Sequence, residues 1–164
     1  MAIDLQAENA GEQKFWSAIR NYWDAIDIYA SPEDFLVAFE ALPEPIGHLI
    51  AVCWCDQEIC NGGFYQFFKN GTGILAPEAI IGYQAIGLLG CAKIVEKPIA
   101  MFGNPYPRDR KLRHSILGKL DRDGETREQW DPFGSFDTSY YAIKNKERIF
   151  ETMGRYAENH AGQQ

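Results

Sequence analysis

Apolar residues recur at three- and four-residue intervals along most of the chain, which is the spacing of amphipathic helices. Ser31-Pro32 is typical of the start of a helix, and Asn70-Gly71 is typical of the end of one. The expected helices span residues 12–29, 32–42, 45–60, 64–69, 108–120 and 138–160, and one more begins at residue 77 and runs through Leu89. No segment alternates apolar and polar residues over enough positions to build a sheet. The pattern predicts an all-α fold, a compact multi-helix bundle in which residues 1–164 form a single domain.

The segment NGGFYQFFKNGTG, residues 61–73, interrupts this pattern with paired glycines. Either Gly62 or Gly63 can adopt the left-handed conformation that ends a helix, with Phe64 folding back on the last turn. A short aromatic helix over residues 64–69 then follows. The segment therefore predicts a sharp change of direction near the middle of the chain.

Composition narrows the class of protein. Of the 164 residues, 46% are hydrophobic and 24% are charged, which is typical of a globular domain. The first residues lack the basic and apolar regions of an export signal. The longest uncharged stretch, residues 79–92, is shorter than the roughly 18 apolar residues of a membrane span. We therefore expect a soluble, cytoplasmic protein that makes no contact with a membrane.

Cysteine and histidine spacing gives no sign of a metal centre. Cys53, Cys55 and Cys60 crowd one segment, and His48 is the nearby imidazole. A zinc site would need two paired ligand sets with short internal spacing. Buried free thiols in a reducing compartment explain the pattern better, so we expect neither a metal nor another cofactor.

Negative charge is concentrated in the first part of the chain. The net charge is −7, yet residues 1–60 hold eleven acidic and two basic side chains, which leaves the remainder slightly basic. An acidic surface repels nucleic acid and attracts basic proteins. The acidic side chains expected to form a protein-binding surface are Asp24, Asp27, Glu33, Asp34, Glu40, Glu44, Asp56 and Glu58. Carboxylates three or four residues apart on a helix lie about 5–6 Å apart, so such a surface can imitate a row of DNA phosphates.

Catalytic patterns are weak by comparison. No nucleophile lies at a spacing that demands a neighbouring base, so we expect no catalytic residue. Residues 71–76 match the dinucleotide fingerprint G-x-G-x-x-A, but an expected helix precedes them instead of a strand. The basic run at residues 108–114 is typical of a solvated helix face, or it could form ion pairs with the acidic side chains of residues 1–60. An alternative is a small-ligand protein or enzyme built on a polar and aromatic centre, with Trp54, Cys55, Asp56, Tyr65 and Gln66 lining a pocket.

From about residue 41 to residue 160 the sequence resembles the DNA-mimic protein family, which consists of small, acidic, all-helical bacterial proteins. The matching features are Glu58, Asn61-Gly62-Gly63-Phe64, Gln66-Phe67-Phe68, Asn70, Gly73, Ala85-Ile86-Gly87, residues 137–141 and Tyr156. The resemblance implies an all-α domain, often a homodimer, that occupies the DNA-binding face of a transcription regulator through surface carboxylates. Together with the weak catalytic patterns and the acidic charge, this leads us to expect a non-catalytic protein that does not bind nucleic acid directly. An immunity-type protein that neutralises a basic toxin fits the same physics.

Overall fold

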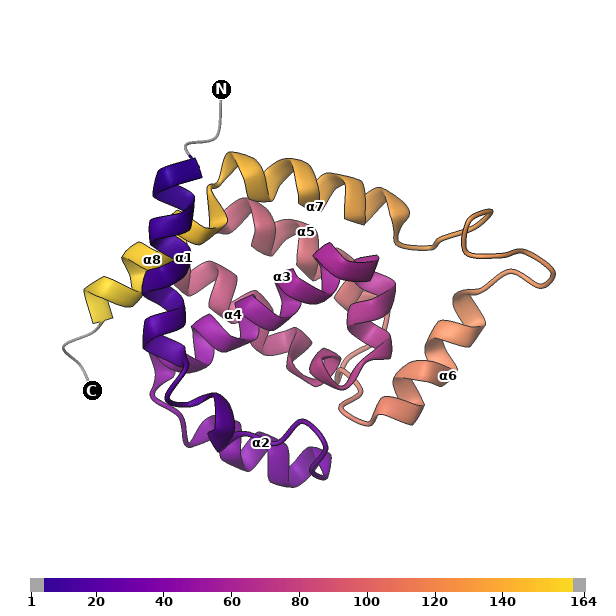
Figure 1. The fold of residues 1–164 in the computed structure, drawn as a ribbon. Helices are drawn as coiled ribbons and strands as arrows, with labels where there is room; N and C mark the ends of the chain where they lie inside the picture. The colour runs from indigo at the N-terminus through magenta and orange to yellow at the C-terminus, as the bar shows by residue number, and fades with distance from the viewer. Residues whose placement is uncertain (1–4, 161–164) are drawn as a thin grey trace.

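Helices follow one another through residues 5–160, which are the residues that the computed structural model describes (Figure 1). They are α1 (Leu5–Ile19), α2 (Pro32–Glu40), α3 (Glu44–Lys69), α4 (Ala76–Ile86), α5 (Leu89–Ala100), α6 (Arg110–Leu120), α7 (Gly134–Lys146) and α8 (Ile149–His160), with 3₁₀ turns η1 (Trp23–Ala25) and η2 (Gly71–Leu75). No strand occurs in this part of the chain, so the predicted all-α fold is confirmed.

α3 is the central helix, and it packs against α4, α6, α7 and η2. Its consecutive residues from Leu49 to Asp56 are all buried. A helix that is covered on every side in this way organises the core of a domain. The other helices surround it, with α2 on one side and α7 on the opposite side (Figure 1).

The predicted interruption of α3 at the paired glycines is confirmed. Gly63 has a φ of +72°, and a Cβ atom there would lie 2.4 Å from a carboxylate oxygen of Asp137. That carboxylate accepts a hydrogen bond of 2.8 Å from the backbone N–H of Phe64, which begins the last part of α3. Burial raises the pKa of Asp137, and the bond from Phe64 opposes this shift. The glycine thus lets α7 supply a cap to the bent helix.

The first helix ends ten residues before the predicted position. α1 stops at Ile19, and the apolar spacing continues through η1, where Trp23 stands edge-on to Trp54 with ring centroids 5.4 Å apart. Ile26 then takes an extended conformation and is buried. Packing of these side chains on α3 outweighs the local preference for continuing the helix. The chain turns here to place α2 beside the first half of α3, where Phe35 stacks on Trp54.

Two other predicted helices are each divided. Gly87, with a φ of +93°, ends α4, and the N–H of Leu88 donates back to Tyr83 O in the manner of a Schellman cap. Arg148, with a φ of 51°, separates α7 from α8. Helical periodicity continues across both breaks because the flanking residues still face the core.

α8 lies against α1, so the two ends of the described chain meet (Figure 1). A Cβ atom on Gly154 would lie 2.5 Å from the Cα atom of Gly11, so the helix backbones touch at this crossing. Among the helices of the described residues, none combines the length and the hydropathy that a membrane span requires.

Candidate functional site

Six of the predicted acidic side chains lie exposed around α2. We call this set the α2 acidic surface, and it consists of Asp24, Asp27, Glu33, Asp34, Glu40 and Glu44. The sequence contains no lysine or arginine between Arg20 and Lys69. Within residues 5–160, no lysine or arginine forms an ion pair with any member of the set; only His48 approaches one, with its Nε2 atom 4.0 Å from Glu44. The surface therefore keeps its negative charge.

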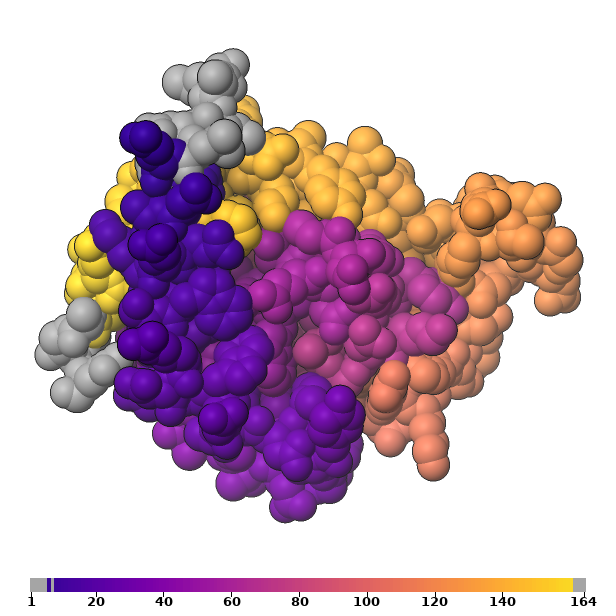
Figure 2. Space-filling model, viewed as in Figure 1, coloured from indigo at the N-terminus to yellow at the C-terminus, as the bar shows by residue number. Residues whose placement is uncertain are grey.

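α2 displays its charges because its other face is anchored in the core. Phe35 and Phe39 are buried, and Ser31 caps the helix by accepting a hydrogen bond of 3.1 Å from the N–H of Asp34. Glu33 and Glu40 are two turns apart and share the outward face. The segment that carries the surface occupies the indigo and purple part of Figure 2. The geometry of α2 thus places Glu33 and Glu40 in one row on the exposed face of the helix.

Asp24 and Asp27 belong to this surface, but they do not lie on the helix that was predicted to carry them. They lie in η1 and in the turn after it, so their predicted place on a helix over residues 12–29 is wrong. The carboxylate of Asp27 accepts a hydrogen bond of 2.9 Å from the N–H of Tyr29, which stabilises the turn. Both side chains are exposed, in the segment that precedes α2.

Asp56 does not belong to the acidic surface, and its predicted exposure is wrong. Only 3% of the residue is exposed, because α7 covers it. Its Oδ1 atom accepts a hydrogen bond of 2.8 Å from Tyr140 and lies 2.7 Å from Nζ of Lys144. Burial, the largest single influence, lowers the pKa of Lys144, but the charge of Asp56 together with the hydrogen bonds to Asp56 and Cys60 outweighs it, so that the pKa is raised. The two residues form a buried ion pair that joins α3 to α7.

The groups around this ion pair are held in their neutral forms. The hydroxyl groups of Tyr83 and Tyr140 lie 2.5 Å apart, and burial raises the pKa of both well above the ordinary value. Burial and the charge of Asp56 also raise the pKa of Cys60, whose Sγ atom accepts a hydrogen bond of 3.0 Å from Lys144. A protonated thiol is a weak nucleophile. The geometry fits a structural network and gives no support to covalent catalysis.

Glu58 was also predicted to belong to the acidic surface, but it is half-buried. Its carboxylate accepts three hydrogen bonds, from Gln66 at 2.7 Å, Asn70 at 2.9 Å and Thr72 at 2.7 Å. The donors come from the last part of α3 and from η2. Glu58 therefore stabilises the conformation of the chain that follows the bend in α3. Most of the acceptor capacity of its carboxylate is used by these three hydrogen bonds.

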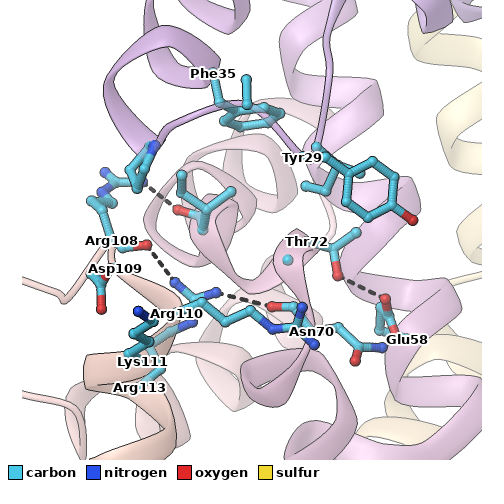
Figure 3. Close-up of a pocket in the computed structure, with 15 residues that line it drawn as sticks. Tyr29, Phe35, Glu58, Asn70, Thr72, Arg108, Asp109, Arg110, Lys111 and Arg113 are labelled. Atoms are coloured by element: carbon cyan, nitrogen blue, oxygen red, sulfur yellow. Dashed lines mark hydrogen bonds between the residues drawn. The ribbon is translucent and has the colours of Figure 1, made fainter.

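A cleft of about 550 Å³ separates the start of α2 from the basic run near α6 (Figure 3). The guanidinium group of Arg108 makes a bidentate ion pair with the carboxylate of Glu78, with N···O distances of 2.6 and 2.7 Å. The buried Arg113 donates to the carbonyl oxygens of Phe68 and Asn70, at 3.0 and 2.9 Å. Arg113 thus stabilises the carboxyl end of α3, where cations are favoured. Arg108 instead pairs with Glu78 in the first turn of α4. Within the described residues, no ion pair joins the basic side chains that line this cleft to the α2 acidic surface.

The five side chains of the alternative polar and aromatic centre are not gathered in one of the described clefts. Trp54 and Gln66 line a shallow cleft of about 510 Å³, whereas Asp56 lines a separate one of about 380 Å³. Cys55 is fully buried, and the guanidinium of Arg127 covers the ring of Tyr65 at 3.2 Å. Across the described residues, no three histidine, cysteine or acidic side chains gather in a way that could hold a metal ion.

Comparison with known proteins places the chain in a family. A family model described as "DMP19-like protein" matches residues 40–160. A search of curated proteins and a search of solved structures gave no match. The matched segment runs from the end of α2 to the end of α8 and includes the whole of α3 with its bend. Because it covers well over half of the sequence, the chain belongs to the DMP19-like family.

Proposed function

We propose that the chain is a non-catalytic binding protein whose α2 acidic surface docks on a basic protein. The observation that carries this proposal is the exposure of six carboxylates in a stretch without lysine or arginine. Like charges gathered on one surface repel each other and weaken the folded state slightly. Complementary charges on a partner relieve this repulsion and speed association.

The proposed partner is a DNA-binding transcription regulator, and the proposed mode is imitation of DNA. Glu33 and Glu40 project from one rigid helix face, and Asp24 and Asp27 are exposed in the segment that leads into that helix. A DNA-binding protein already carries lysine and arginine side chains arranged for a row of phosphates. The resemblance to the DNA-mimic family supports this choice over other basic partners, such as a toxin.

The first experiment is quantitative capture of partners from native lysate at about 50 and 300 mM salt, because charge-dominated association weakens as salt rises. The test variant is Asp24→Lys/Glu33→Lys/Glu40→Lys. A matched control changes the net charge equally through three exposed acids elsewhere, Glu96→Lys/Asp123→Lys/Glu128→Lys. We expect a basic protein to be recovered by the wild-type chain and by the control at low salt, and to be lost with the test variant. Equal recovery by both variants would overturn the proposed surface.

The second experiment separates DNA imitation from simple charge attraction. The captured regulator is loaded on its labelled DNA site and titrated with the wild-type chain at constant ionic strength. DNA release in proportion to added protein is the expected result, since both ligands need the same basic face. A stable complex of all three molecules would exclude imitation and leave the acidic docking intact.

A further inference from the structure

An apolar groove adjoins the α2 acidic surface. It lies where α2 and the start of α3 meet α4, and its volume is about 240 Å³. Its apolar lining consists of Leu36, Phe39, Leu42, Gly47 and Ile81. This volume is below the range of about 300–1,000 Å³ that is usual for sites of drug-sized ligands. It suits one or two apolar side chains of a protein better than a free small molecule.

Ile81 is the exposed apolar residue of this groove. Its side chain belongs to α4 and is 54% exposed, although it lies beside the buried Phe39. Gly47 forms part of the floor, and a Cβ atom at this position would make an ordinary van der Waals contact of 3.4 Å with the ring of Phe39. On the outward face of α2, Val37 is 69% exposed and lies between Glu33 and Glu40 in helical register. Apolar surface is thus available both inside the groove and beside it.

The rim of the groove is acidic. Glu40, Glu44 and Glu78 line it together with His48. Glu78 is neutralised by Arg108, whereas within the described residues neither of the other two carboxylates pairs with a lysine or arginine. Two members of the α2 acidic surface therefore border an apolar depression. Protein interfaces often combine an apolar centre with a charged rim in this way.

We propose that this groove receives a large apolar side chain from a basic amphipathic helix of the partner, with lysine or arginine residues one turn away contacting the rim carboxylates. The inference rests on the proposed function, since it specifies how the partner that is attracted by the α2 acidic surface is seated. Charge complementarity selects the basic helix. An extended peptide could not pair with a sheet edge here, because residues 5–160 contain no strand.

Charge attraction and apolar anchoring predict opposite effects for one substitution. Ile81→Glu removes the apolar contact and adds a negative charge. If attraction alone held the partner, this variant would bind a basic helix more tightly. If the groove anchors a side chain, it binds more weakly, because the anchor faces a charged group. Leu112→Glu on α6, 52% exposed in the wild type, adds the same charge away from the groove and serves as the matched control.

The test is a titration of the ¹⁵N-labelled full chain, followed by NMR, with two synthetic helical peptides of identical lysine and arginine content. One peptide carries leucine at its central anchor position and the other carries alanine. We expect the leucine peptide to bind about tenfold more tightly and to shift the resonances of Gly47 and Ile81. Ile81→Glu is expected to abolish this difference and to weaken binding, whereas Leu112→Glu keeps the difference.

Three results would overturn the inference in distinguishable ways. Equal binding of the two peptides, or tighter binding by Ile81→Glu, would show that charge acts alone, and the proposed function would stand. Failure of both peptides to bind at about 20 mM salt would count against the proposed function as well. If sedimentation shows a wild-type dimer that only Ile81→Glu dissociates, a second copy of the chain fills the groove.

Discussion

The carboxylates of the α2 acidic surface and those of Asp56 and Glu58 differ in what surrounds them. Asp56 faces Lys144 and Tyr140, and Glu58 accepts three hydrogen bonds. The acids around α2 are exposed and, within residues 5–160, have neither a lysine nor an arginine as an ion-pair partner. An acidic side chain with buried donors stabilises the fold, whereas one without them is available to a partner.

The largest expected effect on the free energy of unfolding comes from removing the buried carboxylate of Asp56. Asp56→Ala leaves the charge of Lys144 buried and unpaired, and we expect a loss of about 3–5 kcal/mol in the free energy of unfolding. Urea denaturation followed by circular dichroism measures it. The control, Glu40→Ala on the α2 acidic surface, is expected to stay within about 0.5 kcal/mol of the wild type.

A second substitution distinguishes the pair from general damage to the core. Asp56→Ala/Lys144→Met removes both charges, and it should regain part of the lost stability because no unpaired charge is left. If the double variant were less stable than Asp56→Ala alone, the ion pair would not explain the cost.

Glu58→Gln is expected to have an intermediate effect. The amide has one acceptor oxygen where the carboxylate has two, so the Thr72 hydroxyl must turn round and accept from the new amide, and the bonds from Gln66 and Asn70 lose the strength that the negative charge gives them. We expect a loss of about 2 kcal/mol, measured by urea denaturation. Glu128→Gln in an exposed loop is the matched control, and equal unfolding midpoints for the two variants would contradict the structural role of Glu58.

A smaller effect is expected at Glu147, whose carboxylate accepts hydrogen bonds from the N–H groups of Gly90 and Cys91, at 2.6 and 2.9 Å. These N–H groups begin α5, so Glu147 acts as a cap supplied from another helix. We expect Glu147→Gln to cost about 1 kcal/mol and to speed amide hydrogen exchange at Cys91. Unchanged exchange there would show that the cap does not hold the start of α5.

The sequence predicts the helical parts of this molecule better than the roles of its acids. The paired glycines, the serine cap of α2 and the helix over residues 108–120 all follow from local chemistry, and the structure contains each of them. Glycine conformation and capping act within a few residues, so a single sequence carries their signal.

Long-range contacts explain what the sequence could not predict. Asp56 resembles the other acids in sequence, and its burial depends on Lys144, which lies 88 residues later and on another helix. The break at Arg148 is equally hidden, because apolar periodicity runs through it. A lysine on the same helix as the buried Tyr140 was the available clue to the ion pair.

The division between structural and binding carboxylates is tested most directly by neutralising the α2 acidic surface without changing its shape. The variant Asp24→Asn/Glu33→Gln/Glu40→Gln should unfold within about 0.5 kcal/mol of the wild type, and at low salt it should be slightly more stable because repulsion is reduced. In the same preparation, low-salt recovery of the basic partner should fall at least about tenfold. Undiminished recovery, or a stability loss comparable with that of Glu58→Gln, would contradict the proposed role of these residues.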